Sequence, residues 1–490
     1  MYFVTLHHEK GEKALALFEK FVSVSNNILW SYILIILLIV LGVYFTFRTR
    51  FVQFRMFGEM IRLLGDGVGD TAKGKGGVSS FGAFCISTAS RVGTGNLAGV
   101  ALAISLGGPG AVFWMWLIAL IGSASAFVEA TLAQIYKVKD KDGFRGGPAY
   151  YMEKALRQRW MGVLFAVLIT LCFGLVFNSV QANTITLALE SAYGFNRMVV
   201  GIIITVLTAF VIFGGIKRIV KVAEIIVPVM AGGYVLLALY IVLTNLTLVP
   251  EVFATIFSSA FGLREVAGGT IGAALMAGIK RGLFSNEAGM GSAPNAAATA
   301  TVSHPVKQGL IQSLGVFVDT LLICSATAFI VLLSDAYKTE GLEGIAIVQA
   351  ALGSHVGSWA GSFVAIAIFL FAFSSVVGNY YYGETNIEFI NTNKNWLFVY
   401  RLAVIAMVMF GSVAEISIVW NMADLFMALM AITNLIAIAL LGKIAFQALQ
   451  DYTKQKKQGK DPVFYTSSIP GLKEAECWPE TAAEASQNSK

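Results

Sequence analysis

The sequence predicts an all-α integral membrane protein, and composition and the spacing of apolar runs carry that prediction. Of the 490 residues, 57% are hydrophobic and only 13% are charged, with a mean hydropathy of +0.72, whereas soluble domains carry roughly 25% charged residues. Apolar runs of about 20 residues, the length of a helix that crosses a bilayer, recur almost from end to end, and the strands of a membrane barrel would be about half as long. We expect about eleven spans, near residues 28–48, 80–104, 111–136, 161–189, 198–215, 221–244, 265–284, 308–333, 358–385, 397–416 and 420–446.

The connections between these spans alternate in their content of Lys and Arg. By the positive-inside rule the basic connections are cytoplasmic, which places the C-terminus in the cytoplasm and the N-terminus outside. The net charge of +6 follows from the same bias and does not call for a nucleic-acid partner. The basic group comprises the link before residue 80, the loop 137–159, Lys217, Arg218, Lys221, Lys280, Arg281, Lys307, Lys394, Arg401 and the tail lysines.

The chain divides into five segments. We expect an N-terminal amphipathic segment at 1–27, an extra transmembrane helix with a basic interfacial link at 28–79, two repeats at 80–244 and 245–447, and a cytoplasmic tail at 448–490. Without the extra helix, the spans divide into about five plus five, and the two halves begin on opposite sides of the membrane. Oppositely oriented halves that each start with an interrupted span indicate an inverted-repeat transporter with its site near the membrane midplane.

Glycines interrupt the first span of each half. In the first half, Gly93-Thr94-Gly95-Asn96 breaks an apolar run, although a glycine inside a helix costs about 1 kcal/mol against alanine. Unwound backbone inside a membrane is tolerated only where it is buried in protein or lines a cavity. In the second half the glycines have an alternative explanation, which is close packing of helices. They are Gly268, Gly269, Gly272, Gly278 and Gly282.

Polar groups at the first break suit a cation and a carboxylate. Free N–H groups at a half-helix suit a carboxylate, and free carbonyls suit a small cation. Asn96 adds an amide oxygen and Thr94 a hydroxyl. Asp319 lies in the middle of a later span, where an ionisable residue is a functional candidate. It either completes a cation site with Asn96 or forms a hydrogen bond to a neighbouring helix.

Other polar residues inside the spans are candidates for the same site. A serine in a membrane helix usually bonds back to its own backbone, but Ser374 and Ser375 point in different directions, so we expect at least one to be a ligand. Gln181 can donate and accept hydrogen bonds toward an amino acid. Glu129 is expected to brace the free N–H groups of a broken helix, a structural use. Glu287 is expected near the cytoplasmic end of its span, in a gating or loop contact.

The sequence does not favour an enzyme. It contains no phosphate-binding loop and no His-Glu-x-x-His pair, so neither nucleotide hydrolysis nor zinc-dependent hydrolysis is supported. The four histidines fall in termini or loops, which leaves no histidine partner for a serine nucleophile at membrane depth. The spacing of Cys85, Cys172, Cys324 and Cys477 indicates neither a disulfide framework nor a metal site.

Two runs carry a resemblance to a known family. GGPGAVFWMWLIALIG, from Gly107 to Gly122, resembles the signature of the alanine or glycine:cation symporter family, the bacterial and archaeal sodium:alanine symporters. GIKRGLFSNEAGMGSAP, from Gly278 to Pro294, resembles the second hallmark of that family. The resemblance covers about residues 28–450. It implies the LeuT-type fold of the amino acid-polyamine-organocation superfamily, with a 5+5 inverted repeat and one extra N-terminal helix.

The resemblance also implies roles for individual residues. The Gly-x-Gly-Asn motif of the family matches Gly93 to Asn96, so Asn96 would bind the first sodium, and backbone groups of Thr94 and Gly95 would hold the substrate carboxylate. Glu129 matches a glutamate that steadies the unwound segments, and Arg91 beside the break departs from the wider LeuT-type pattern. The remaining implied positions are the Ala89 and Val92 carbonyls with the Ser374 and Ser375 hydroxyls for a second sodium, and Met276, Ala277 and Gly278 for substrate.

The function that follows is import of a small neutral amino acid, alanine or glycine, coupled to Na⁺ across the bacterial cytoplasmic membrane by alternating access. Sodium orders the broken helices, so the amino acid binds more tightly afterwards, and the coupling is reciprocal. The partners are the amino acid, sodium and the lipid bilayer. A larger substrate such as glutamine, coupled to sodium or protons, is the alternative within the class, and a channel or a sensor is the alternative outside it.

Overall fold

The computed structural model describes residues 17–69, 78–140, 143–214, 216–262 and 270–487. Over these residues it is helical apart from one antiparallel hairpin, β1 (Val138–Asp140) and β2 (Gly143–Arg145). The first sixteen residues of the expected amphipathic segment, Lys73 and Lys75 of the basic link, and Gly268 and Gly269 lie outside the described residues.

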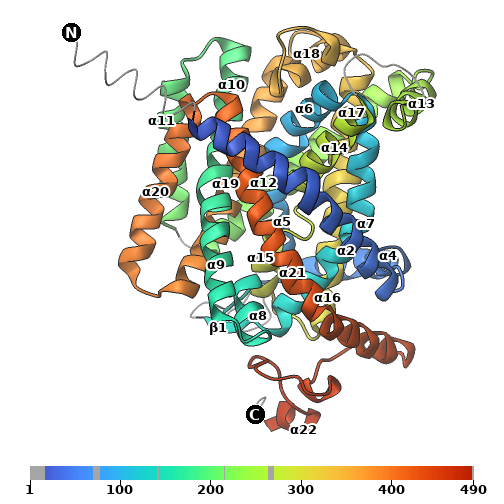
Figure 1. Ribbon diagram of the computed structural model, residues 1–490, viewed down its shortest axis with the longest axis vertical. Coiled ribbons are helices and arrows are strands. Elements are labelled where there is room, and N and C mark those ends of the chain that lie inside the picture. The colour runs from blue at the N-terminus through green and yellow to red at the C-terminus, as the bar shows by residue number, and fades with distance from the viewer. Residues whose placement is uncertain (1–16, 70–77, 141–142, 215, 263–269, 488–490) are drawn as a thin grey trace.

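Seven helices of the described chain are long and apolar enough to cross a membrane, and each coincides with a predicted span. Figure 1 shows them packed side by side, with α18 and α13 at one end and α8, β1 and α22 at the other. They are Leu17–Arg48 (with η1 Leu29–Leu34 and α2 Ile35–Arg48), α7 Gly110–Ile135, Arg159–Tyr193 (α9 Arg159–Ile169, η3 Thr170–Phe177, α10 Asn178–Tyr193), Pro305–Leu332 (α16 Pro305–Val316, η4 Phe317–Cys324, α17 Ser325–Leu332), α19 Ala360–Ile390, α20 Lys394–Val413 and α21 Ile416–Lys457.

The other predicted spans are short, bent or broken. Helix α12 (Ile216–Thr244) carries Pro228, and its part from Pro228 onward makes a bend of 104° with α13 (Val249–Ala260), a pair that counts as an eighth span when taken together. The shorter apolar helices include α11 (Arg197–Ile212), at a predicted span, and α18 (Ile345–Val356), which no predicted span covers. The predicted total of eleven crossings therefore stays a prediction. The broken spans are α5 Ser80–Arg91 with η2 Thr94–Asn96 and α6 Ala98–Gly107, and α14 Ile271–Asn286 with α15 Ala293–Thr299.

The second break is not where the glycines predicted it. Helix α14 continues through Gly272, Gly278 and Gly282, and the chain unwinds only between Glu287 and Ser292. A Cβ at Gly278 would lie 2.4 Å from the Ala111 carbonyl oxygen of α7. This glycine therefore allows close packing of α14 on α7, the alternative explanation, and does not unwind the helix. The backbone leaves the helix where φ turns positive, at Glu287, Gly289 and Gly291.

Two basic residues assigned to a cytoplasmic connection lie inside a helix. Lys280 and Arg281 are within α14, and both side chains reach Asp424 of α21. They therefore belong to a buried ion-pair cluster that joins two helices, and the side of the membrane on which they lie stays a prediction.

Three of the basic connections and the tail nevertheless meet at one end of the molecule. Tyr452 near the end of α21 donates a hydrogen bond of 2.6 Å to Glu59 of α4 (Phe57–Gly69), and His304, which caps α16, lies 3.2 Å from Asp451. Lys154 of α8 (Pro148–Lys154) pairs with Glu476 of the tail. The smaller elements of the described chain are α3 Val52–Arg55, η5 Ala336–Lys338, η6 Thr466–Ser468 and α22 Ala482–Gln487.

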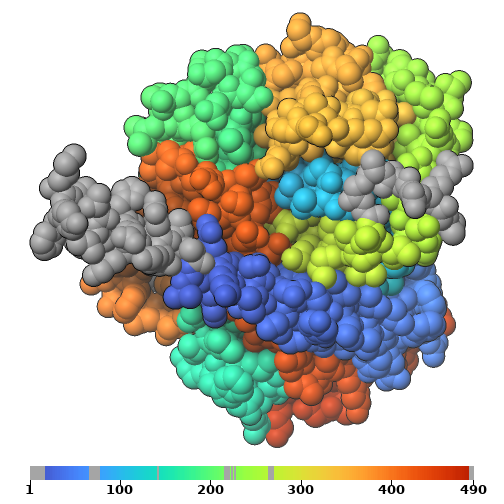
Figure 2. All heavy atoms as spheres, turned by 45° about the horizontal axis from the view of Figure 1, so that its top comes forward, coloured from blue at the N-terminus to red at the C-terminus, as the bar shows by residue number. Residues whose placement is uncertain are grey.

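The extra N-terminal helix lies across a face of the bundle. Figure 2 shows the blue N-terminal segment as a band over that face. The indole N–H of Trp30 donates to the Asp424 carbonyl at 3.2 Å, and Phe45 packs against Phe446 with ring centroids 6.1 Å apart. Both contacts join this helix to α21.

The segment after α21, from residue 458 to 487, folds back onto the same end of the bundle and is called the tail below. The Phe464 amide donates to the Ser303 carbonyl at 2.9 Å, and the Trp478 indole donates to the Gln134 carbonyl at 3.0 Å. The Lys137 ammonium lies 4.9 Å from the centre of the Trp478 ring. The tail therefore spans from the α15–α16 connection to the end of α7.

Candidate functional site

The first break forms where three helices approach the backbone too closely for a side chain. Helix α5 ends at Arg91, and the chain passes through Gly93 at φ −153° and ψ −140° before the single turn η2. A Cβ at Gly93 would lie 2.2 Å from Ser375 Oγ, and a Cβ at Gly95 would lie 2.8 Å from the Phe284 ring. A Cβ at Gly93 would also lie 2.8 Å from Gln181 Oε1 of α10, so the two glycines bring the unwound backbone into contact with α19, α14 and α10.

Side chains already satisfy two backbone amides at this break. Gly93 N–H donates to Asn96 Oδ1 at 2.9 Å, and Thr94 N–H donates to Gln181 Oε1 at 2.9 Å. The structure thus brings Gln181, the predicted substrate contact, directly to the predicted carboxylate position. The Thr94 hydroxyl is buried and has no hydrogen-bond partner among the described residues.

A buried carboxylate joins the first break to the helix after the second. Asp319 Oδ1 accepts from Asn96 Nδ2 at 2.6 Å, and Oδ2 accepts from the Ser285 and Thr320 hydroxyls, both at 2.9 Å. Asp319 lies in the π-helical segment η4, and such segments are frequent at functional sites. A carboxylate offers about four acceptor positions, so three donors leave oxygen capacity for a cation.

The predicted second sodium position is partly assembled. Ser375 Oγ lies 3.3 Å from the Val92 carbonyl, whereas Ser374 Oγ donates to Phe371 of its own helix at 2.9 Å. Ala89 is buried one turn earlier in α5. Of the two serines, Ser375 is therefore the one that reaches the break.

Glu129 reaches the second break. Its two carboxylate oxygens accept from the Gly289 and Gly291 amides, both at 3.1 Å, and Asn434 Nδ2 donates to it at 2.8 Å. The carboxylate is fully buried. This geometry matches a bracing role, and it places the brace on the second broken helix.

Glu287 lies at the end of its helix, as the sequence predicted, since it caps α14, and it is buried in the second break. Ser90 Oγ of α5 lies 3.0 Å from Glu287 Oε1 and 2.6 Å from Asn379 Oδ1, and Ser292 donates to Glu287 Oε2 at 2.6 Å. Its φ of 57° ends α14, and the unwound chain follows. Glu287 thereby connects the end of α5 to the second break.

Arg91 turns away from the break, so its presence does not disturb the unwound turn. Its NH1 lies 3.4 Å from the Gln312 carbonyl, in space that a Cβ at Gly315 would block at 2.3 Å. The buried guanidinium is close enough for Coulombic attraction to Glu129, Glu287 and Asp319.

The structure does not bring the predicted substrate positions on α14 to the first break. Ala277 lies against Gly107 at the far end of α6, and Gly278 packs on α7. Because α14 unwinds later than predicted, the residues of α14 that touch Gly95 are Phe284 and Ser285. Met276 precedes Phe284 by eight residues, which is about 12 Å along a helix.

Aromatic side chains form a wall beside the first break, and the sequence did not predict this wall. Phe284 stacks on Phe177 with ring centroids 4.4 Å apart and lies 4.7 Å from the Trp420 ring. The Arg281 guanidinium covers Trp420 at 4.5 Å. Phe177 directly precedes the helix that carries Gln181. The only sequence signal for this wall is aromatic residues near the predicted polar groups, which does not specify their convergence.

Two broken helices that bring backbone amides, hydroxyls and carboxylates together inside a bundle of membrane-spanning helices define a secondary transporter. The family model of the sodium:alanine symporter family matches residues 15–466, and the chain belongs to that family. It is therefore a sodium-coupled symporter of small amino acids, with Na⁺ as the co-transported ion.

Relatives match over nearly their whole length. The chain is 60% identical to the "Probable sodium/glutamine symporter GlnT" of Bacillus subtilis, over 96% of this chain and 98% of that protein. It is also 60% identical to the "Amino-acid carrier protein AlsT" of the same organism, over 96% and 99%. The "Sodium/alanine symporter AgcS" of Methanococcus maripaludis is 37% identical over 90% and 98%.

Among solved structures, the crystal structure of MhsT in complex with L-phenylalanine is similar with a TM-score of 0.50 at 14% sequence identity, covering 84% of this chain and 95% of that chain. This similarity concerns the overall fold alone. It supports the LeuT-type arrangement that the sequence resemblance implied.

Proposed function

We propose that the chain imports alanine or glycine together with sodium across the bacterial cytoplasmic membrane by alternating access. The observation that carries the site assignment is the contact of Asn96 with both Gly93 and Asp319. Asn96 and Asp319 supply oxygens for one sodium, since amide and carboxylate oxygens are hard ligands suited to a hard cation. The Val92 and Ala89 carbonyls with Ser375, and Ser374 as a weaker member, supply the other.

The substrate carboxylate lies at the amides of Thr94 and Gly95 in this proposal. Gln181 now accepts from the Thr94 amide, so a bound carboxylate either replaces the Gln181 oxygen or takes a hydrogen bond from its NH₂ group. The aromatic wall of Phe284, Phe177 and Trp420 limits the space for the substrate side chain. One sodium that enters down a potential of 100 mV contributes about 2.3 kcal/mol, which corresponds to roughly fifty-fold accumulation.

Glutamine is a second candidate substrate, because a relative at 60% identity is named a probable sodium/glutamine symporter. Both candidates are tested by uptake of labelled alanine, glycine and glutamine into proteoliposomes, with and without an inward sodium gradient. Saturable, sodium-dependent alanine or glycine uptake supports the proposal. Uptake of glutamine alone overturns the choice of substrate, and equal uptake without sodium overturns the coupling in this proposal.

The site is tested in the same assay with Asn96→Ala. We expect a loss of at least tenfold in sodium-dependent uptake, together with weaker activation by sodium. The matched control is Thr208→Val on α11, which removes a buried hydroxyl that has no partner among the described residues and lies outside the proposed site. Equal loss in both variants, or none in either, would contradict the assignment of Asn96.

The proposed orientation has the C-terminus in the cytoplasm and the N-terminus outside. The meeting of three basic connections and the tail at one end supports it. Cys477 in the tail is partly exposed, whereas Cys85, Cys172 and Cys324 are buried, so Cys477 is a natural reporter. Burial raises the pKa of the Cys477 thiol, and maleimide labelling should therefore be carried out at alkaline pH. Labelling in inside-out but not in right-side-out vesicles is the expected result, and the reverse pattern would invert the topology.

A further inference from the structure

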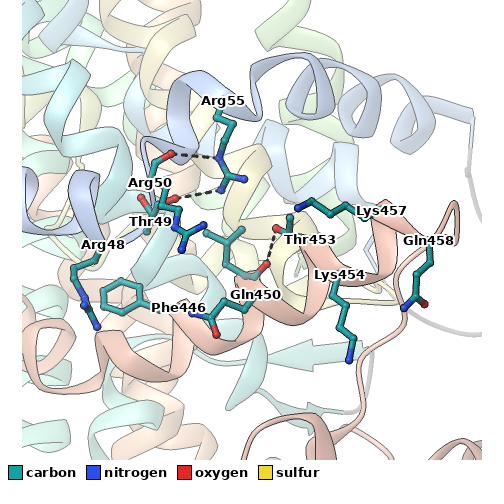
Figure 3. A pocket seen from close by; sticks show the side chains of 11 residues that line it. Arg48, Thr49, Arg50, Arg55, Phe446, Gln450, Thr453, Lys454, Lys457 and Gln458 are labelled. Atoms are coloured by element: carbon teal, nitrogen blue, oxygen red, sulfur yellow. Dashed lines mark hydrogen bonds between the residues drawn. The ribbon is translucent and has the colours of Figure 1, made fainter.

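A basic cavity lies where the N-terminal transmembrane helix meets the end of α21. It encloses about 440 Å³, and its lining contains Arg48, Arg50, Arg55, Lys454 and Lys457 but no Asp or Glu. Figure 3 shows these side chains around one hollow. Arg48 comes from the end of α2, Arg50 from the turn after it, Arg55 from α3, and the lysines from α21. We propose that this cavity binds the phosphate-bearing headgroup of an anionic phospholipid.

The turn after α2 is built to bring the arginines together. Arg50 and Phe51 both have positive φ, at 55° and 56°, a conformation that costs a non-glycine residue of order 1 kcal/mol or more. The Arg55 guanidinium holds this turn by donating to the carbonyls of Arg50 and Thr49, both at 3.3 Å. Arg55 therefore fixes the backbone, and the side chains of Arg48 and Arg50 are left to face the cavity.

The other cations of the cavity form no ion pair in the part of the chain that the structure describes, although the Asp451 carboxylate attracts Lys454. They are Arg48, Arg50, Lys454 and Lys457, and Arg48 lies over the Phe446 ring at 5.4 Å. The neighbouring acid, Glu59, is already bonded to Arg62, Lys456 and Tyr452. Like charges that converge repel one another, so an anion between them is stabilised.

The position of the cavity identifies the anion as a lipid headgroup. It lies at the ends of two apolar helices that are long enough to cross a membrane, and basic pockets at such ends bind anionic headgroups. Exposed apolar side chains precede it on both helices, with Phe47 64% and Leu440 66% exposed. A phosphate in the cavity thus leaves acyl chains beside apolar surface. The bound lipid would connect the N-terminal helix to α21.

The test compares lipid retention by the purified, delipidated full-length protein in native mass spectrometry. The probes are dioleoyl phosphatidylglycerol, dioleoyl phosphatidylcholine and glycerol 3-phosphate. The loss variant is Arg48→Gln/Arg50→Gln/Lys457→Gln, which spares Arg55 because that residue holds the turn. The matched control, Lys139→Gln/Lys394→Gln/Lys473→Gln, removes the same charge from three exposed lysines elsewhere on the described surface.

We expect wild type and the control variant each to retain one phosphatidylglycerol. The loss variant should bind this lipid about a hundred-fold more weakly, which is about fivefold for each cation removed. The charge-conserving variant Arg48→Lys/Arg50→Lys/Lys457→Arg should retain the lipid, which separates lost charge from misfolding. Equal retention by the loss variant, or equal retention of phosphatidylcholine, overturns the proposal. Competition by glycerol 3-phosphate at the concentration of the lipid would also overturn it, because the site would then be one for soluble phosphates.

Discussion

Replacing Glu129 tests whether one buried carboxylate holds the second unwound segment. Glu129→Ala leaves the amides of Gly289 and Gly291 and one N–H of Asn434 without an acceptor. Each orphaned buried donor costs about 1–3 kcal/mol, so the free energy of unfolding should fall by about 3 kcal/mol or more. Glu129→Gln keeps one oxygen for one of the two backbone amides and turns an NH₂ group toward the other. Its free energy of unfolding should therefore fall by only about 1–3 kcal/mol.

The assay is equilibrium unfolding of the purified protein in mixed detergent micelles, followed by tryptophan fluorescence. The control is Thr131→Val, two residues further along α7. This change is nearly isosteric and removes a buried hydroxyl that has no partner in the part of the chain that the structure describes. It should leave the free energy of unfolding unchanged or raise it by up to about 1–3 kcal/mol, because it removes an unpartnered buried hydroxyl. If both Glu129 variants unfold like Thr131→Val, the carboxylate does not stabilise the break and the reasoning is refuted.

The remaining predictions concern close packing, ion pairing and pH. Gly95→Ala should abolish transport, because its Cβ would lie 2.8 Å from the Phe284 ring, whereas Gly99→Ala meets nothing nearer than 3.5 Å and should transport normally; equal uptake by both variants would contradict this. Asp424→Asn should lower the free energy of unfolding by about 3–5 kcal/mol. Arg281→Met should lower it by less, because Lys280 Nζ remains 3.6 Å from Asp424. If equilibrium unfolding shows a larger loss for Arg281→Met than for Asp424→Asn, Lys280 does not compensate for the missing arginine. Burial lowers the pKa of Lys137 from 10.5 to about 7, so between these pH values the unfolded chain binds a proton that the folded protein does not, and stability should rise with pH. Lys137→Met should remove this rise in melts from pH 7 to 9.5, and identical slopes in both proteins would exclude Lys137 as its source.

The sequence predicted the helices well because membrane spans depend on a local property. A run of apolar residues long enough to cross a bilayer is visible without tertiary information, and the seven long helices coincide with predicted spans. The first break was also predictable, since Gly93, Gly95 and Asn96 lie together in an apolar run. Family membership was predictable from the runs that begin at Gly107 and Gly278, and the match to residues 15–466 confirms it.

The second break was misplaced because a glycine has two uses that look alike in sequence. Gly278 lets α7 pack against α14, whereas Gly289 and Gly291 adopt positive φ in unwound chain. Only the packed structure distinguishes them. The contacts of Ser285 and Phe284 with the first break depend on that register as well. They lie about two turns after Met276–Gly278, whose contact with substrate stays a prediction.

The tail has a consequence for how the protein is made. Its last described residues dock on segments that the ribosome synthesises much earlier, since Trp478 bonds to Gln134 and Phe464 to Ser303. This end of the bundle therefore cannot reach its final packing until the tail has emerged from the ribosome. A purification tag belongs after Gln487, where it leaves both contacts intact, and a truncation after α21 would leave the surface around Ser303 and Gln134 uncovered.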